Sequence, residues 1–327
     1  MISSGAPPEF CRTDSGNIRA SSVRTMGVAL GLVLPMWERP PAGPVPSWSE
    51  IREMAGRAES LGADTVWLAD EILWRVPGWP ALVGWWDCLT MAGAIAASTS
   101  TVNVGTWVMS AVQHKPGMIA RAAESLDEIS GGRFVLGLGT GHGGGAISFG
   151  FETTRSVTRY MEALEVLMPL LRGGPAVTFE GEFHQASEAE VRPRGPRPGR
   201  VPLMMGGHSP VTMKAAATHA DIWSAFATTS SIPEAFKSMT AQLDQICGTI
   251  GRDPASIGRS VGVFVEPTSC GLAERLDLGV PITGSVSQMS ETIAGFTDVG
   301  VTRVEIHPLP HTIEALEQLA PVFAALT

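Results

Sequence analysis

The sequence predicts an α/β protein, a single-domain (β/α)8 TIM barrel that carries a small insertion hairpin. Eight short apolar segments alternate with eight amphipathic segments along nearly the whole chain. The apolar segments are hydrophobic at successive positions, which is typical of parallel strands buried on both faces. Eight is also the number of parallel strands at which such a sheet closes on itself.

The expected strands are six to nine residues of mostly apolar sequence, several of them ended by glycine or proline. The eight strands are expected at 27–35, 65–70, 102–110, 133–139, 201–207, 221–226, 260–267 and 301–308. A further pair of short segments at 177–186, with Gly181 at the turn, predicts the insertion hairpin.

The expected helices show an apolar stripe at helical spacing. In the first one Ser47 or Ser49 can cap the start, and Gly62 ends it. Its stripe consists of Ile51, Met54, Ala55, Ala58 and Leu61. The eight helices are expected at 47–62, 87–99, 116–132, 154–174, 209–220, 232–251, 285–300 and 312–327. Residues 1–25 are polar and aperiodic and predict a disordered tail before a domain over 26–327.

Composition limits the classes of partner. Hydrophobic residues make up 44% of the 327, and the net charge is −9, which argues against nucleic acid or an anionic membrane as the main partner. Cys11, Cys88, Cys247 and Cys270 form no C-x-x-C pair, and no apolar leader or span of about 18 apolar residues is present. We therefore expect a cytoplasmic protein that acts on a small molecule.

A glycine-rich stretch follows the fourth expected strand. Gly139, Gly141 and Gly144 match G-x-G-x-x-G, the pattern that binds the pyrophosphate of a dinucleotide. That pattern also needs a helix opening on the last glycine and an acidic residue about 20 residues on. Glu162 lies in that region, but in the middle of a predicted helix. We therefore favour glycines that let the backbone approach a ligand at the barrel rim, with a merely flexible loop as the alternative.

Several segments together resemble one known family. The stretch 105–141, above all LDEISGGRFVLGLGTG at 126–141, resembles the luciferase-like monooxygenase superfamily of flavin- and F420-dependent oxidoreductases. Weaker matches occur in family order at 62–71, 85–100, 201–223 and 300–308. The resemblance covers about residues 26–310. It implies a TIM barrel that holds coenzyme F420, or alternatively FMN, at the carboxyl ends of the strands, commonly in a homodimer.

The resemblance also implies positions for the cofactor. Asp70 matches an aspartate beside the ring, with a loop or capping aspartate as the alternative. Its neighbour, a histidine in F420 enzymes, is here Glu71, which leaves the substrate open. Trp107 and Val108 match a pair that forms a non-prolyl cis peptide behind the ring in many members, although Trp107 also fits core packing.

Two loops match cofactor contacts of the family. The loop after the fourth strand contributes Gly139, Thr140, Gly141 and His142. The loop after the fifth contributes Gly206, Gly207, His208 and Ser209, placed before a helix whose first turn contains Pro210. Backbone N–H groups and the helix dipole there suit a phosphate. The alternative is an ordinary strand–helix turn with Ser209 as N-cap.

No single residue is assigned a catalytic role from the sequence. The candidates are His142, Glu71 and His307, with His114 as a further possible proton donor. Five tryptophans fall in or near the first two strand-to-helix connections, where they either wall an apolar pocket or cover the barrel as packing: Trp37, Trp74, Trp79, Trp85 and Trp86. We expect no metal site, because we find no carboxylate cluster with metal spacing.

The sequence therefore favours an F420- or FMN-dependent oxidoreductase that transfers hydride to or from a small organic substrate. The chain has 20 arginines and three lysines, a bias typical of GC-rich genomes. Bacteria that make F420 include many with such genomes, so the bias slightly favours F420 over FMN. No cation follows the sixth strand in SAFATTSS (224–231), so we expect a substrate other than a sugar phosphate. The alternative function is a non-catalytic barrel that binds or stores flavin.

Overall fold

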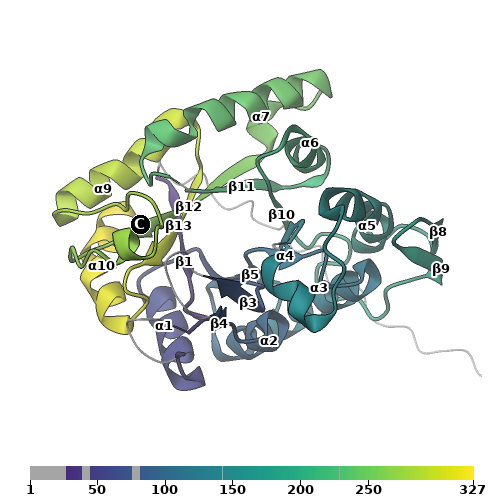
Figure 1. Ribbon diagram of the computed structural model, residues 1–327, viewed down its shortest axis with the longest axis horizontal. Helices are drawn as coiled ribbons and strands as arrows, with labels where there is room; N and C mark the ends of the chain where they lie inside the picture. The colour runs from purple at the N-terminus through teal and green to yellow at the C-terminus, as the bar shows by residue number, and fades with distance from the viewer. Residues whose placement is uncertain (1–26, 39–44, 76–81, 142, 228) are drawn as a thin grey trace, which may run out of the picture.

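The computed structural model describes residues 27–38, 45–75, 82–141, 143–227 and 229–327. The predicted tail at 1–25 lies outside these ranges. The core is a closed barrel of eight parallel strands, as the sequence predicts. Figure 1 shows the helices around it. The barrel strands are β1 (Ala29–Val33), β2 (Thr65–Leu68), β5 (Asn103–Thr106), β7 (Phe134–Gly139), β10 (Leu203–Gly206), β11 (Ile222–Phe226), β12 (Gly258–Val265) and β13 (Arg303–Pro308).

Pairing between β7 and β10 closes the sheet, with Leu203 opposite Leu136. The helices between the strands are α1 (Trp48–Ser60), α2 (Cys88–Ser98), α3 (Pro116–Ser130), α5 (Ser156–Leu171), α6 (Pro210–His219), α7 (Lys237–Thr249), α9 (Val286–Ala294) and α10 (Ile313–Leu326). Each expected strand and helix is confirmed, usually one or two residues shorter at its ends. The predicted hairpin is also present as antiparallel β8 (Val177–Glu180) and β9 (Gln185–Ala189), at the side of the molecule beyond α5 (Figure 1).

Several short elements were not expected, among them the 3-10 helix η3 (Pro254–Ser256) before β12. A second hairpin, β3 (Leu73–Arg75) with β4 (Leu82–Gly84), lies in the connection between β2 and α2. Short helices α4 (Gly143–Ala146), η1 (Ile147–Phe149) and α8 (Leu272–Arg275) lie in later connections. None of these helices exceeds four residues, and both strands have three residues. Segments this short carry too few residues to show a helical or strand periodicity.

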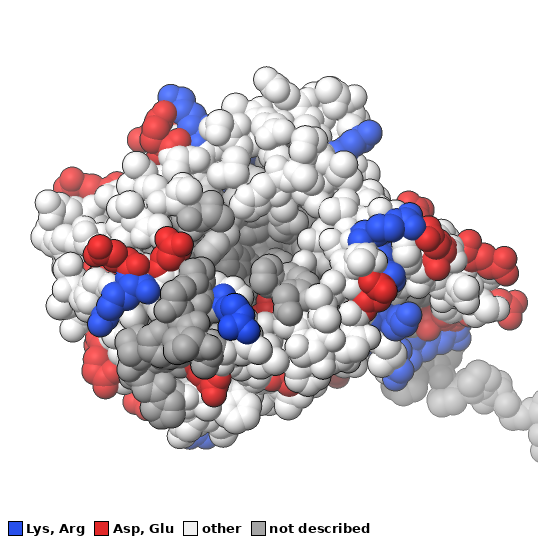
Figure 2. Space-filling view, viewed as in Figure 1, with Lys and Arg blue, Asp and Glu red and all other residues white. Residues whose placement is uncertain are grey.

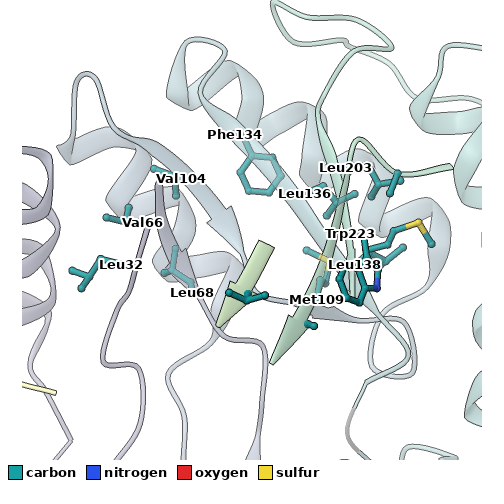
Figure 3. Close-up of a cluster of buried hydrophobic side chains, with 14 of the residues drawn as sticks. Leu32, Val66, Leu68, Val104, Met109, Phe134, Leu136, Leu138, Leu203 and Trp223 are labelled. Carbon is teal, nitrogen blue, oxygen red and sulfur yellow. The ribbon is translucent and has the colours of Figure 1, made fainter. Parts of the chain in front are cut away.

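Alternate residues of each strand face the helices and form the main core. Figure 3 shows part of this layer, with Leu32, Val66, Val104, Leu136 and Trp223 among the labelled side chains. All five are buried. The alternation follows from the two-residue period of a strand, so the intervening residues face the inside of the barrel.

The inside of the barrel holds one large ring and a buried ion pair, together with Val33, Val135 and Met204. Trp67 from β2 is fully buried and its Nε1–H donates to Glu305 Oε2 at 2.5 Å. Arg303 Nε lies 3.2 Å from Glu305 Oε1, and Arg303 also pairs with Asp64 at 2.7 Å. Burial raises the pKa of Glu305 although Arg303 opposes that shift. Space for the indole exists because Gly105 stands opposite it, where a Cβ would lie 2.2 Å from the ring.

None of the helices in the described part of the chain is both long and apolar enough to cross a membrane.

Candidate active site

A cavity of about 630 Å³ opens at the carboxyl ends of the barrel strands. Figure 2 shows the molecule hollowed near the centre of the face seen there, with uncharged side chains above the hollow and a Lys or Arg side chain at its lower edge. Nine residues expected near a cofactor line the cavity: Asp70, Trp107, Val108, Gly139, Thr140, Gly141, Gly206, Gly207 and His208. The structure therefore brings the ends of barrel strands two to five to one place.

Two of the three catalytic candidates, Glu71 and His307, line the same cavity. The third, His142, lies outside the described residues, as does Trp79. Ser209 is not among the lining residues. The groups expected from the sequence to meet at the mouth thus largely do so, with Ser209 as the exception.

Asp70 is held in a fixed orientation at the end of β2. Its Oδ2 accepts a hydrogen bond from the Ser110 backbone N–H at 2.8 Å and lies 2.9 Å from His114 Nε2. Burial lowers the pKa of His114, but the hydrogen bond and charge of Asp70 outweigh it, so this pKa is raised. Asp70 caps no described helix, since the N-cap of α2 is Asp87. It lies in the loop after β2, so the alternative of a loop aspartate stays open beside a place next to the cofactor.

The third strand is interrupted at Trp107 and Val108. Their peptide bond is cis, as the family resemblance implies, and strand pairing with β7 resumes at β6 (Met109–Ser110). The Trp107 Nε1–H donates to Ser224 Oγ at 3.1 Å across the barrel. Val108 and Trp107 both face the cavity, so this bulge forms part of its floor.

The glycines after β7 are required by close packing as well as by the cavity. A Cβ on Gly139 would lie 2.7 Å from Val108 Cγ2, and one on Gly141 would lie 1.9 Å from Ser110 Oγ. Gly141 also has φ +87°, a conformation that favours glycine. Both glycines therefore let the loop after β7 lie directly against the bulge. The closed barrel contains no open doubly wound sheet, so the dinucleotide interpretation of this motif is wrong.

The loop after β10 leads from the cavity to the start of α6. Gly206, Gly207 and His208 line the cavity, and Gly207 has φ +148°. Ser209 is the N-cap of α6, because its Oγ accepts from the Thr212 N–H at 3.2 Å. The positive end of a ten-residue helix thus directly follows the lining residue His208.

Aromatic side chains line the opposite part of the mouth. The His307 ring centroid lies 5.0 Å from that of Trp107 and 5.2 Å from those of Phe226 and Phe264. His307 Nε2 is buried and has no hydrogen-bond partner within the described ranges. Burial, together with the nearby His311, lowers the pKa of His307 well below its usual value. The imidazole is therefore neutral at pH 7.

Three of the predicted tryptophans form one wall of the cavity. Trp37 stacks on Trp85 with ring centroids 5.4 Å apart, and Trp74 meets both rings edge-on. Trp86 lies away from this wall, since it is 42% exposed and its Nε1–H donates to the Pro46 carbonyl. The wall brings together the β3–β4 hairpin and the connection after β1.

Sequence reasoning missed several cavity residues. His311, four residues after His307, lies in the same mouth, and the repeat HPLPH was a visible signal for it. Phe226 and Phe264 end strands in which they looked like ordinary core residues. Within the ranges that the structure describes, no group of three or more His, Cys, Asp or Glu side chains could hold a metal ion.

Comparison with known proteins decides the family. The profile of the family described as Luciferase-like monooxygenase matches residues 27–269. The chain belongs to this family. Luciferase-like relatives include an F420-dependent glucose-6-phosphate dehydrogenase from Nakamurella multipartita, 33% identical over 189 residues, which are 56% of this chain and 52% of the relative. A second is the phthiodiolone/phenolphthiodiolone dimycocerosates ketoreductase of Mycobacterium kansasii, 27% identical over 286 residues, 78% of this chain and 77% of the relative.

Solved structures support the same fold. A structure described as an F420-dependent secondary alcohol dehydrogenase in complex with an F420-acetone adduct superposes with a TM-score of 0.77 at 16% identity. The match covers 92% of this luciferase-like chain and 100% of the other. A long-chain alkane monooxygenase gives 0.73 at 14% identity, over 93% and 92% of the two chains. The matches to the glucose-6-phosphate dehydrogenases span only about half the length of those relatives.

Proposed function

We propose that this luciferase-like chain is an oxidoreductase that uses coenzyme F420, with FMN as the alternative, to transfer hydride to or from a small organic substrate. The observation that carries the proposal is the convergence of Asp70, Val108, Gly139 and Gly207 on one cavity. Several relatives are F420-dependent glucose-6-phosphate dehydrogenases, and an F420-dependent secondary alcohol dehydrogenase and a long-chain alkane monooxygenase share the fold.

The residues present fit such a cofactor. Glycines 139, 141, 206 and 207 line one side of the cavity with backbone. A Cβ on Gly139, Gly141 or Gly207 would collide with neighbouring protein atoms, and only Gly206 has room for one. The start of α6 offers a positive dipole end for a phosphate group. A bound F420 or flavin would supply the ring that carries hydride.

The chain's own groups would position this ring and exclude water. The Trp107–Val108 bulge would support one face of it, and Asp70, oriented by Ser110 and His114, would present its carboxylate at the edge. The tryptophan wall would shield the reacting atoms from solvent. Of the catalytic candidates, His142, Glu71 and His307 each remain to be tested.

The test is a titration of the purified protein with F420 and with FMN. The tighter ligand identifies the cofactor, and failure of both would overturn the proposal. Gly206→Ala gives a directed version, because no protein atom lies closer than 3.6 Å to the added Cβ. We expect it to keep its stability and to lose about tenfold in cofactor affinity, about 1.4 kcal/mol. Gly56→Ala, in α1 with nothing within 4 Å of its Cβ, is the control.

A non-catalytic flavin-binding or storage barrel is the second candidate. The same cavity would serve it, so binding alone does not separate the two functions. A cofactor that stays bound but undergoes no change of redox state with any substrate would favour storage. Oxidation or reduction of the bound cofactor together with loss of substrate would favour the enzyme.

We further propose that the substrate is not a sugar phosphate. No lysine or arginine occurs among the described residues that line the cavity, whereas Asp70, Glu71 and Asp277 do. Among the described lining residues, a phosphate dianion in the substrate region would therefore meet carboxylates and no lysine or arginine. Efficient turnover of glucose 6-phosphate would contradict this proposal.

We also propose a homodimer in the cytoplasm, without nucleic acid or a membrane as partner. Ile147 and Phe149 in η1 are 63% and 61% exposed, which suits a protein contact better than water. Cys88 and Cys247 are buried free thiols, as in proteins of reducing compartments. Sedimentation of Phe149→Asp tests the dimer, since a dimer formed through η1 would dissociate.

A further inference from the structure

The cavity has two chemically different halves. Bare glycine backbone and the Asp70 carboxylate lie at the ends of β2, β7 and β10. Trp37, Phe226, Phe264, His307 and His311 lie at or just after the ends of β1, β11, β12 and β13, and Trp74 and Trp85 from the β3–β4 hairpin pack against Trp37. Trp107 stands at the boundary, because its ring contacts both Phe226 and His307. The proposed cofactor uses the first half and leaves the second without an assigned ligand.

The second half contains a buried polar atom that needs a partner. His307 is 9% exposed, lines the cavity, and its Nε2 has no hydrogen-bond partner in the described part of the chain. Such buried groups in native proteins are nearly always paired, with protein, water or ligand. A neutral imidazole carries one N–H and one lone pair, so Nε2 can donate to a carbonyl oxygen or accept from a hydroxyl.

The surroundings of His307 define what the rest of the ligand must be. Phe226 and Phe264 flank the imidazole, and the wall of Trp37, Trp74 and Trp85 faces the same space. Apolar surface is buried favourably against such rings. A negative charge would find no lysine or arginine among the described lining residues.

We infer that the half of the cavity at the ends of β1, β11, β12 and β13 binds an uncharged, largely apolar substrate whose one oxygen is held by His307 Nε2. His307 is thus a positioning and specificity residue for a ketone or the corresponding alcohol. The inference rests on the proposed function, because the bound molecule is a substrate only if the chain is an oxidoreductase. Binding of such a molecule can nevertheless be measured without turnover.

Three matched probes test the inference by calorimetry or ligand-observed NMR on the full chain. Acetophenone is an uncharged aromatic ketone, 4-acetylbenzoate adds a carboxylate, and ethylbenzene lacks the oxygen. We expect acetophenone to bind about fivefold more tightly than ethylbenzene, the size of one hydrogen bond. We expect 4-acetylbenzoate to bind at least about tenfold more weakly than acetophenone. Equal affinities for all three would overturn the inference.

Variants assign the effect to one side chain. His307→Phe keeps an aromatic ring and removes the nitrogen, so acetophenone should lose its advantage while ethylbenzene binding is unchanged. His307→Gln, which restores an N–H, should recover part of the advantage, which a purely structural role would not predict. His219→Phe, at the end of α6, is the control and should bind all probes as the parent does. An unaltered preference in His307→Phe would refute the role of His307.

The cofactor titration separates this inference from the proposed function. Acetophenone should bind with the same affinity when F420 or FMN is saturating, and competition between them would refute the division into halves. If the cofactor binds and acetophenone does not, only the inference on the substrate fails. If neither cofactor binds but the probes discriminate as expected, the proposed function fails and the site for an uncharged substrate stands.

Discussion

The imidazole of His114, just before α3, lies 2.9 Å from the carboxylate of Asp70 at the end of β2. The same oxygen accepts the backbone N–H of Ser110, two residues beyond the Trp107–Val108 bond. One carboxylate therefore ties together the segment after β2, the bulge of the third strand and the approach to α3.

Replacing Asp70 by Asn should lower the pKa of His114. The carboxylate raises this pKa above 6.5 against the opposing effect of burial, and an amide carries no charge to do so. Since the folded pKa is raised, the pair stabilises the protein fully below pH 6.5 and less as pH rises through the folded pKa. The variant should thus lose about 1 kcal/mol at acidic pH and less at alkaline pH. NMR titration of His114 and thermal melts check both; an unchanged His114 pKa would contradict the assignment.

Replacing Trp67 by Phe should strongly destabilise the barrel. The change removes the N–H that donates to the buried Glu305 and leaves unfilled volume inside the barrel. We expect a loss of about 3 kcal/mol in the free energy of unfolding, from urea denaturation. Trp48→Phe is the matched control, because Trp48 is 39% exposed at the start of α1 and should shift stability by less than about 0.5 kcal/mol.

Replacing Gly141 by Ala should cost more than the same change at Gly150. The two glycines have similar φ values, +87° and +80°, so the backbone penalty is shared. Only at Gly141 would the new Cβ meet a neighbour, Ser110 Oγ at 1.9 Å, whereas nothing lies within 4 Å at Gly150. We expect about 1 kcal/mol of destabilisation at Gly150 and about 2 kcal/mol more at Gly141. Equal melting temperatures for the two variants would contradict this prediction, because they would show that the loop after β7 shifts away from Ser110 at no cost in stability.

Replacing Glu59 by Gln should weaken the protein at neutral pH and have little effect in acid. Glu59 Oε1 accepts from the backbone N–H groups of Ser100, Thr101 and Val102. Burial opposes these bonds, yet they lower the pKa of Glu59 from 4.5 to about 2. Stability from this group is therefore present above pH 4.5 and lost as pH falls toward about 2. Allowing for solvent screening, we expect about 1 kcal/mol at pH 7, by denaturant unfolding at both pH values.

Periodicity was enough to predict the barrel because its strands and helices are long and apolar on the correct faces. Gly-Gly at 131–132 and Pro210, for example, bound α3 and α6 where the sequence places those boundaries. The β3–β4 hairpin was missed because strands of three residues show no alternation. Among the residues that line the cavity, the glycines and Asp70 were predicted from their match to family motifs.

The roles of other residues could not be predicted from the sequence because they depend on contacts between distant segments. Gly139 and Gly141 looked like ligand-approach glycines, yet their direct neighbours are Val108 and Ser110 from the preceding strand. His307 could equally have been a satisfied core histidine, and only the folded barrel leaves its Nε2 without a partner in the described ranges. For Ser209 the sequence left a phosphate contact and an N-cap as alternatives, and the structure shows the N-cap.

The inward residues of β13 form a ladder in which Arg303 and Glu305 belong to the interior ion pair and His307 reaches the mouth. Residues that stabilise the barrel, Arg303 and Glu305, and the residue that we infer binds the substrate, His307, are thus successive inward positions of one strand. Substitution of His307 should therefore leave the Arg303–Glu305 ion pair intact, because that pair lies two or more residues earlier in the strand and deeper in the barrel. The ligand preference of this chain could therefore be redesigned by changing His307 while keeping Arg303 and Glu305.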